Sequence, residues 1–381
     1  MTRKTHAAAI ALALLPCAVL AQSSTVVIYG KLNVDVETLS ANGPNASDTR
    51  KHRVSSNSSL LGFRGEEALG GGLSAFFQIE SSAGVDTGSG TLAGRSSAVG
   101  LKGPAGSLLM GQWDTPYKNS TLKLDPFTNK TFAGYGAVLY GNSSPTVGNI
   151  ANRQAFDRRQ KNVIQYWSPE SKSGFKGRLA YGMGEEKGTC AVACDPRLLS
   201  ASGTYEHGPL TLIAAYERHD EYANTATVRT RDDALRLATH YVSGATTFSG
   251  IAEQLTYRGN LAATGLPKAF TPGNAAAVKV RNAWGAVTHR IGRQLLRLSY
   301  GQSADLKLDG GGPGASAVDT GMRYWAVGYA YQPSKRTELY MTYARIDNDA
   351  RSSGDFGTAA LGGVTAGAHP TGFGMGITHS F

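Results

Sequence analysis

Alternation of apolar and polar residues with a period of two is the feature that most constrains the fold of this chain. It is clearest over residues 26–37, where Val, Ile and Leu side chains share one parity. The other parity there is polar: Lys31, Asn33, Asp35 and Glu37. The same alternation returns at 73–80, 175–183 and 338–343, broken in the first of these by Phe76. A period of two is typical of β-strands with one apolar and one wet face, so the chain is predicted to be all-β.

The connections between these strands alternate between short and long. Short turns of Gly, Pro and Ser fall at 69–72, 103–106, 168–174, 207–209, 243–245, 291–293 and 332–335. Longer segments fall near 39–52, 83–94, 114–158, 185–197, 219–231, 259–277, 304–319 and 347–369. An even strand number with short turns at one rim and long loops at the other is typical of outer-membrane barrels. Soluble sandwiches and propellers lack this rhythm. These connections predict a transmembrane antiparallel β-barrel of 16 strands.

The first residues have the pattern of a cleaved signal peptide at 1–21. Arg3 and Lys4 precede a short apolar run, and a small-residue cleavage site follows at Val19–Ala21. The apolar run is shorter than the ~20 residues that a membrane-spanning helix needs. We therefore expect an exported protein whose mature part, residues 22–381, is a single barrel domain.

Net charge and cysteine usage narrow the possible partners. The formal net charge is +10, but the basic residues are scattered along the chain. Nucleic-acid binding is therefore disfavoured, and a basic pore or contact with anionic lipid headgroups fits better. Outside the signal peptide the cysteines are Cys190 and Cys194, for which we expect a disulfide within one loop. A metal site is the alternative, and it is a weak one because no His lies nearby.

The third long connection, residues 114–158, differs from the others. It is about 45 residues long, and a segment of that length without a strand or helix pattern is usually functional or disordered. Disordered segments are poor in aromatic and aliphatic residues, whereas this one contains several, including Tyr117, Phe127, Phe132 and Phe156. We expect a folded loop that packs into the lumen of the barrel.

Four stretches have a recognisable sequence: Val27–Lys31, Leu61–Leu73, Arg95–Gly103 and Gly376–Phe381. With them the chain resembles the general porins of Gram-negative bacteria, particularly those of β-proteobacteria, over essentially the whole mature sequence. The resemblance implies a 16-stranded barrel, usually a homotrimer, with the third loop folded inward to narrow the channel. It also implies that the C-terminal Phe381 is an assembly signal read by the barrel-assembly machinery.

Basic side chains on inward parities are the candidates for the pore lining. Lys31 and Arg64 lie on polar parities and match positions of the family motifs. Arg159 and Lys161 share the parity of the polar Gln165 and re-enter the wall directly after the third loop. Rings of charge select ions in channels, so these residues predict a basic constriction.

Three further candidates are less clear from the pattern. Arg95 matches a wall arginine of the family, but its parity also includes Val99 and Leu101. The loop acids Asp114 and Asp125 either face the solute path or hold the loop by hydrogen bonds. At the position of Leu60 the family commonly has an arginine. One basic residue of the pore lining is therefore missing, and the strength of anion selection is in question.

Aromatic residues beside the short turns suggest a girdle at the membrane interface. They are Tyr166, Trp167, Tyr329 and Tyr331. Outer-membrane lipid and lipopolysaccharide are the expected surroundings. The histidines are dispersed and lie in no nucleophile motif, so no enzyme activity and no cofactor are expected.

The sequence predicts an outer-membrane porin that lets small hydrophilic solutes and ions diffuse passively, with a preference for anions. Two alternatives remain: a substrate-specific channel for small organic anions, and a plugged adhesin or structural barrel.

Overall fold

A computed structural model of the chain describes residues 25–43, 49–128, 130–139, 146–147, 153–185, 192–357 and 360–381. The strands are β1 (Val27–Asn42), β2 (Thr49–Ser56), β3 (Leu60–Gly70), β4 (Leu73–Ser82), β5 (Ser97–Gly103), β6 (Gly106–Asp114), β7 (Thr146–Val147), β8 (Arg159–Trp167), β9 (Phe175–Gly182), β10 (Arg197–His207), β11 (Leu210–Asp220), β12 (Arg231–Ser243), β13 (Thr246–Arg258), β14 (Ala277–Ile291), β15 (Gln294–Ser303), β16 (Lys307–Asp309), β17 (Met322–Tyr331), β18 (Thr337–Asn348) and β19 (His369–Ser380). The helical turns are α1 (Pro116–Thr121), η1 (Tyr135–Ala137) and η3 (Leu261–Ala263).

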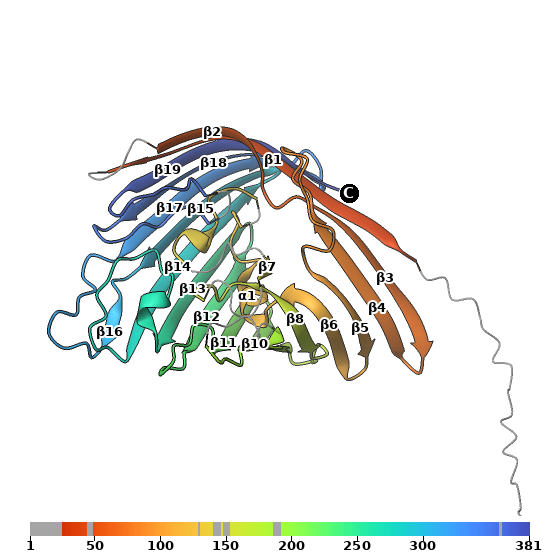
Figure 1. Ribbon diagram of the computed structural model, residues 1–381. Coiled ribbons are helices and arrows are strands. Elements are labelled where there is room, and N and C mark those ends of the chain that lie inside the picture. Colours follow the sequence, from red (N-terminus) through yellow and green to blue (C-terminus); the bar gives the residue numbers. More distant parts are fainter. Residues whose placement is uncertain are drawn as a thin grey trace, which may run out of the picture.

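These segments form one closed sheet (Figure 1). Strands β2 and β3 pair with successive parts of β1, β16 extends the ladder of β15 along β14, and β7 is a short parallel pairing to β8. We count β2 with β3 as one barrel strand and β16 with β15 as another, and we leave out β7. Counted in this way, the wall is the predicted antiparallel barrel of 16 strands. Strand β1 pairs with β19 from Lys31 opposite Ser380 to Asn42 opposite His369. This last ladder closes the ring, so the backbone of each barrel strand has a partner on both sides, as the interior of a membrane requires.

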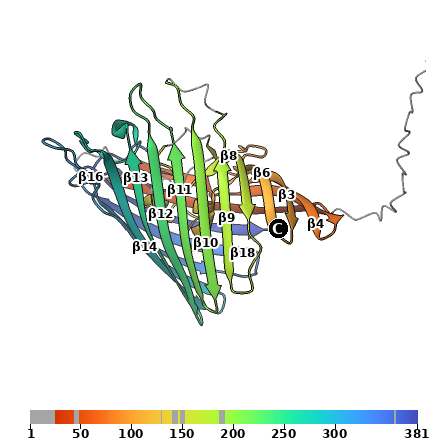
Figure 2. The same ribbon diagram turned by 90° about the horizontal axis from the view of Figure 1, so that it is seen from below.

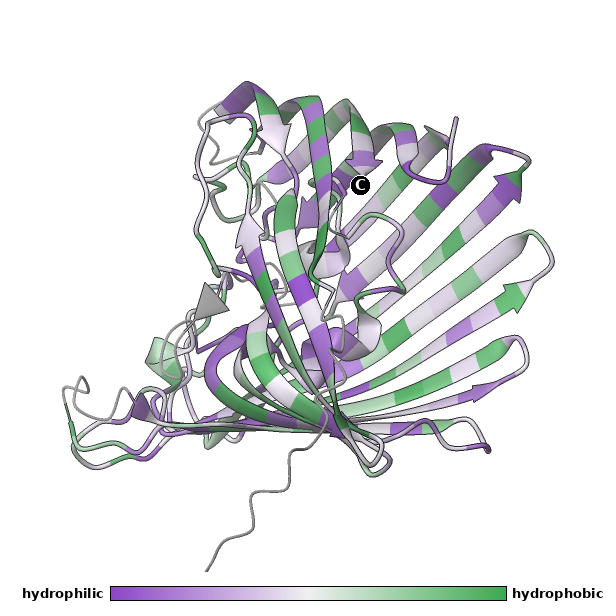
Figure 3. Ribbon diagram, turned by 90° about the vertical axis from the view of Figure 1, so that its right-hand side faces the viewer, coloured by the Kyte–Doolittle hydropathy of each residue, from purple (hydrophilic) through white to green (hydrophobic). Residues whose placement is uncertain are grey.

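The predicted alternation is confirmed along the strands. In β1 the polar residues Asn33, Asp35 and Glu37 are at most 2% exposed, whereas Ile28 and Val36 are each 61% exposed on the outer face. Bands of hydrophobic and hydrophilic residues alternate along the ribbon in Figure 3. An outer face of this kind suits lipid, and the inner face collects the polar and charged side chains.

Two aromatic residues outside the main buried cluster depart from the expected pattern. Trp167 was expected in the interfacial girdle with Tyr166, but its ring packs against Trp113 on the inner side, and only Tyr166 lies on the outer face. Phe76, which breaks the alternation of β4, also faces inward and packs in the same cluster. Both rings lie on the lumen side, where the general pattern calls for polar residues.

The predicted rhythm of connections is confirmed except at the first long connection, expected near 39–52, most of which belongs to β1 and β2. Short turns join β3 to β4, β5 to β6, β8 to β9, β10 to β11, β12 to β13, β14 to β15 and β17 to β18, and we call this end the short-turn rim. The longer connections lie at the opposite end, the long-loop rim (Figure 2). Among the residues described, no helix has the length and apolar character needed to span a membrane.

Candidate functional site: the lumen of the barrel

The connection between β6 and β8 lies inside the ring of strands (Figure 1), and its helix α1 packs against β10 and β11. Thr115 caps α1 by accepting a hydrogen bond from the backbone N–H of Lys118, and Pro116 occupies the first turn, where its missing N–H is not needed. The buried side of the helix includes Tyr117 and Thr121, which contact the wall. The contacts that attach the described residues of this loop to the wall include three groups.

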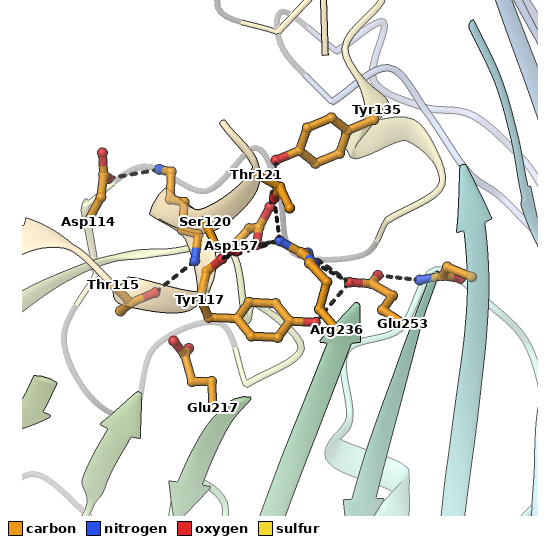
Figure 4. A network of polar contacts seen from close by, with 12 residues as sticks. Asp114, Thr115, Tyr117, Ser120, Thr121, Tyr135, Asp157, Glu217, Arg236 and Glu253 are labelled. Atoms are coloured by element: carbon orange, nitrogen blue, oxygen red, sulfur yellow. Dashed lines mark hydrogen bonds and ion pairs between the residues drawn. The ribbon is translucent and has the colours of Figure 1, made fainter. Parts of the chain in front are cut away.

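The first group centres on Arg236 of β12, which is fully buried (Figure 4). Its Nη2 lies 2.7 Å from Glu253 of β13, and its Nη1 lies 2.8 Å from Asp157 of the loop. The guanidinium also stacks 4.1 Å from the ring centroid of Tyr117, whose hydroxyl donates a 2.8 Å hydrogen bond to Glu253. One buried cation therefore joins two acids and a loop aromatic. Removing it would leave both carboxylates buried without their partner.

A second group lies on the same side of the barrel. Arg153 of the loop donates hydrogen bonds of 2.7 and 2.8 Å to the two carboxylate oxygens of Asp232 on β12. Phe156 stacks on His219 with ring centroids 4.3 Å apart, and His219 stacks in turn on Tyr222 at 4.5 Å. Bidentate arginine contacts fix geometry as well as charge, so this end of the loop is held in one orientation.

The third group consists of loop side chains set against glycines of the wall. A Cβ built on Gly328 would lie 2.7 Å from the Phe127 ring, and one on Gly372 would lie 2.5 Å from the Phe132 ring. The loop carbonyl of Ala133 accepts a hydrogen bond from the Tyr324 hydroxyl. These glycines therefore have a packing role, because a larger residue would overlap the loop. We call the inner faces of β10 to β19, which these three groups contact, the anchored wall.

The two predicted loop acids are both buried. Asp125 accepts hydrogen bonds from the backbone N–H of Phe127 at 2.9 Å, from that of Tyr135 at 2.6 Å, and from the Thr128 hydroxyl at 2.7 Å. Asp125 was expected either to face the solute path or to hold the loop by hydrogen bonds, and these contacts match the second role. Burial raises the pKa of Asp125 to about 6.

Asp114, the other loop acid, lies where β6 ends. It is 8% exposed and lies 3.0 Å from Lys118 Nζ and 3.2 Å from Arg159 Nη2. Burial lowers the pKa of Lys118, and its pairing with Asp114 opposes that shift. A loop lysine thus stands beside the wall arginine, and the sequence analysis did not identify it.

The predicted basic residues near the N-terminus lie on the inner face. Lys31 is half-buried and in register with Leu60 of β3. Arg64 is exposed, and its guanidinium lies 5.1 Å from the ring centroid of Tyr29. Arg95 lies before β5 begins, so strand parity does not apply to it, and its Nε lies 3.8 Å from the carboxylate of Glu80. The apparent conflict of its parity is thereby removed.

Strand β8 begins with a bulge that affects Arg159 and Lys161. Gln160 pairs with Trp113 and Val163 with Gly111, so two residues of β8 oppose a single residue of β6. Asn162 has a positive φ of 53° there. Arg159 is buried against Asp114, but the alternation used to place Lys161 is interrupted at this point, and Lys161 is exposed. Its place in the pore lining stays a prediction.

A cavity of about 630 Å³ borders the inner faces of β3 to β8 near the short-turn rim. Its lining includes Arg64, Lys102, Phe76, Trp113 and Trp167. We call the inner faces of β3 to β9 the cavity wall. A second cavity of about 300 Å³ lies between α1 and β9 to β12.

Arg178 of β9 lines this second cavity, and its guanidinium lies 4.8 Å from the ring centroid of Trp167. Arg178 was not among the predicted site residues, although the parity of its strand already placed it on the polar side.

The remaining predictions concern the cysteines, the C-terminus and the signal peptide. Cys194 is disulfide-bonded and 5% exposed, whereas Cys190 lies outside the described residues, so their pairing stays a prediction. Phe381 and Gly30 exchange two backbone hydrogen bonds of 3.1 Å, which extend the ladder between β19 and β1. The Phe381 ring lies over Gly30. The predicted signal peptide, residues 1–21, also falls outside the described residues.

Comparisons with known proteins agree with this architecture. Residues 7–351 match the Gram-negative porin family. Outer membrane porin protein 32 of Delftia acidovorans is 27% identical over 98% of this chain and 99% of its own length. An outer membrane porin protein of Bordetella pertussis is 27% identical over 85% of this chain and 83% of its own length. A solved structure described as an anion-selective porin from Comamonas acidovorans superposes with a TM-score of 0.75 at 24% identity, covering 94% of this chain and all of that one.

The closed barrel with a charged lumen defines the class of channel-forming outer-membrane proteins. Because the family match covers most of its length, the chain belongs to the Gram-negative porins, and it is located in the outer membrane.

Proposed function

We propose that this porin passes small hydrophilic solutes by diffusion and prefers anions, with the loop between β6 and β8 narrowing the channel. The observation that carries the anion preference is the pairing of charges on the cavity wall. Its inward carboxylates each have a basic partner: Glu66 has Lys102, Glu80 has Arg95, and Asp114 has Lys118 and Arg159.

Arg64 and Arg178 differ from these paired residues. Within the described part of the chain neither forms an ion pair, and their charged groups lie over the rings of Tyr29 and Trp167. Among the described residues, the cavity wall therefore carries two cations that form no ion pair with a carboxylate. A wall of one net sign concentrates counter-ions along the path.

The description of the Comamonas structure as anion-selective is consistent with this preference. The proposal includes the assembly expected from the resemblance, a homotrimer in contact with outer-membrane lipid and lipopolysaccharide and inserted by the barrel-assembly machinery. The exposed apolar residues of the outer faces support contact with lipid.

The reversal potential of single channels across a KCl gradient tests the proposal. We expect a potential on the chloride side and an ohmic conductance. Arg64→Glu should move the reversal potential toward the potassium side. A unit charge about 5 Å from an ion in a water-like medium contributes about 1 kcal/mol, and this free energy corresponds to a severalfold change in ion permeability. Arg258→Glu is the matched control, because Arg258 lies at the exposed end of β13.

Two results would contradict the proposal. A potassium-side potential for the natural chain would leave a porin without the anion preference. A folded barrel that does not conduct would favour the plugged adhesin or structural alternative.

A further inference from the structure

The inner face of this barrel carries an apolar cluster where polar residues are expected. The cluster spans β4, β5, β6, β8 and β9 and consists of Phe76, Ala98, Leu109, Trp113, Val163, Trp167 and Ala180. The sequence pattern already marked Phe76 as an exception to the alternation of its strand. Lumen-facing residues of outer-membrane barrels are mostly polar, so an aromatic cluster on this face calls for a specific explanation.

The two tryptophans of the cluster come from different strands and pack edge to face. Their ring centroids lie 5.5 Å apart at an interplanar angle of 61°. The Trp167 indole N–H donates a 3.1 Å hydrogen bond to Gln165, and Arg178 lies over the Trp167 ring. These contacts fix Trp167 in place, and both tryptophan rings line the 630 Å³ cavity together with Phe76.

The same cavity contains a cation beside the rings. Lys102 and Glu66 also line it, but their charges are paired at 3.3 Å. Arg64 lines it without an ion pair among the described residues, and the residue as a whole is exposed. The cavity thus combines aromatic surface with a guanidinium whose hydrogen-bond donors can take a carboxylate in two parallel bonds.

We propose that this cavity is a binding site for small aromatic carboxylates, which would place their ring against Phe76 and Trp113 and their carboxylate on Arg64. A volume of about 630 Å³ is in the range of small-molecule sites, which combine apolar walls with a few fixed polar groups. The proposal rests on the proposed function, because the ligand reaches the site through the channel. It goes further because the channel would then prefer aromatic anions to non-aromatic anions of equal charge and size.

Two comparison ligands separate this site from simpler explanations. Benzoate and cyclohexanecarboxylate carry the same charge and have six-membered rings of similar size, but only benzoate is aromatic. Partition into a merely apolar pocket favours the saturated ring, which is the more hydrophobic. Aromatic pairs contribute about 0.5–1.5 kcal/mol beyond buried area, so the site should favour benzoate by about two- to tenfold.

The test is a titration of the chloride current of reconstituted channels with each carboxylate at pH 7.5, scored by the concentration that halves the current. We expect benzoate to act at the lower concentration. Trp113→Leu should abolish the difference between the two ligands. Arg64→Gln should weaken both ligands to the same extent. Trp325→Leu is the matched control, because Trp325 lies on the outer face of β17 and should leave the ratio unchanged.

Each outcome decides the proposal. Equal or reversed potency of the two carboxylates overturns it, as does a ratio that Trp113→Leu leaves unchanged, since the cluster would then only stabilise the wall. If Trp113→Leu yields no channel, Phe76→Leu, which alters a half-buried ring of the same cavity, makes the same test. A channel without conductance or without anion preference refutes the proposed function instead, and the titration is read only on channels that pass chloride.

Discussion

The anchored wall and the cavity wall are built from the same alternating strands, yet their inward charges have different surroundings. On the anchored wall, Arg236 is fully buried between Asp157 and Glu253. On the cavity wall, Arg64 is exposed and lies over an aromatic ring. Alternation alone brings each arginine into the lumen. The path of the loop decides whether that charge holds the structure together or remains available to solutes.

This comparison separates two kinds of mutational effect. Substitutions on the anchored wall should change stability and the position of the loop, and those on the cavity wall should change selectivity and leave stability nearly unaltered. The following predictions are ordered by the size of the expected effect.

The largest effect is expected for Arg236→Met. Removing the guanidinium leaves Asp157 and Glu253 buried without their cation, and breaking a buried pair in this way costs about 3–5 kcal/mol. The free energy of unfolding in detergent or liposomes, measured by denaturant titration, should fall by that amount. Arg258→Met is the control: Arg258 pairs with Asp233 with its side chain 44% exposed, and exposed pairs contribute about 0–1 kcal/mol. Equal losses for both variants would contradict the distinction between the walls.

Asp125 is expected to make the free energy of unfolding depend on pH by up to about 3 kcal/mol, because its pKa is shifted by about two units. Its pKa is raised from 3.8 to about 6 by burial. Between these pH values the folded barrel retains a proton on Asp125 that the unfolded chain releases. The stabilisation of the folded barrel by this proton is therefore fully present below about pH 4 and is lost as pH rises through 6. Asp125→Asn should therefore reduce the fall in the free energy of unfolding between pH 4 and 7. An unchanged slope would contradict this assignment.

A smaller loss of stability is expected for Gly328→Ala. The added Cβ would meet the Phe127 ring at 2.7 Å, and overpacking of a filled site costs about 1–3 kcal/mol. Gly203→Ala on β10 is the matched control, because no atom lies within 4 Å of its Cβ position. In a Phe127→Leu background, Gly328→Ala should cost less than it does in the natural chain, as measured by denaturant unfolding in a double-mutant cycle. An equal cost in both backgrounds would mean that the ring does not occupy the space above Gly328.

Much of the fold could be predicted from the sequence, because alternation and turn chemistry are local properties. The strand number and, except at the first long connection, the short–long rhythm of connections are confirmed, and the inward parity of Lys31 and Arg64 agrees with where they lie. Parity failed where the backbone is irregular. Arg95 lies before its strand begins, and Lys161 lies in a bulge.

The contacts across the lumen could not be predicted, because no local pattern encodes them. Arg236 has an inward parity, but its partners come from the loop and from β13. The role of Gly328 depends on which loop residue reaches it. Phe76 was visible in the sequence as a break in the alternation, whereas Trp167 was wrongly expected at the membrane interface. The role of both residues became clear only when their rings lay in one cluster.

The smallest effect, and the one that tests the cavity wall most directly, is expected for Leu60→Arg. Leu60 faces the lumen in register with Lys31, so a second cation there strengthens the local positive potential. At low salt the permeability ratio of chloride to potassium should rise by about twofold, because an exposed charge near the path contributes well under 1 kcal/mol after screening. Leu60→Gln, a neutral polar control, should leave the reversal potential unchanged. Since like charges on opposed strands repel, a small loss of stability should accompany the gain in selectivity. An unchanged ratio for Leu60→Arg would place the ion path away from β3 and would move the selective region of the channel toward the loop.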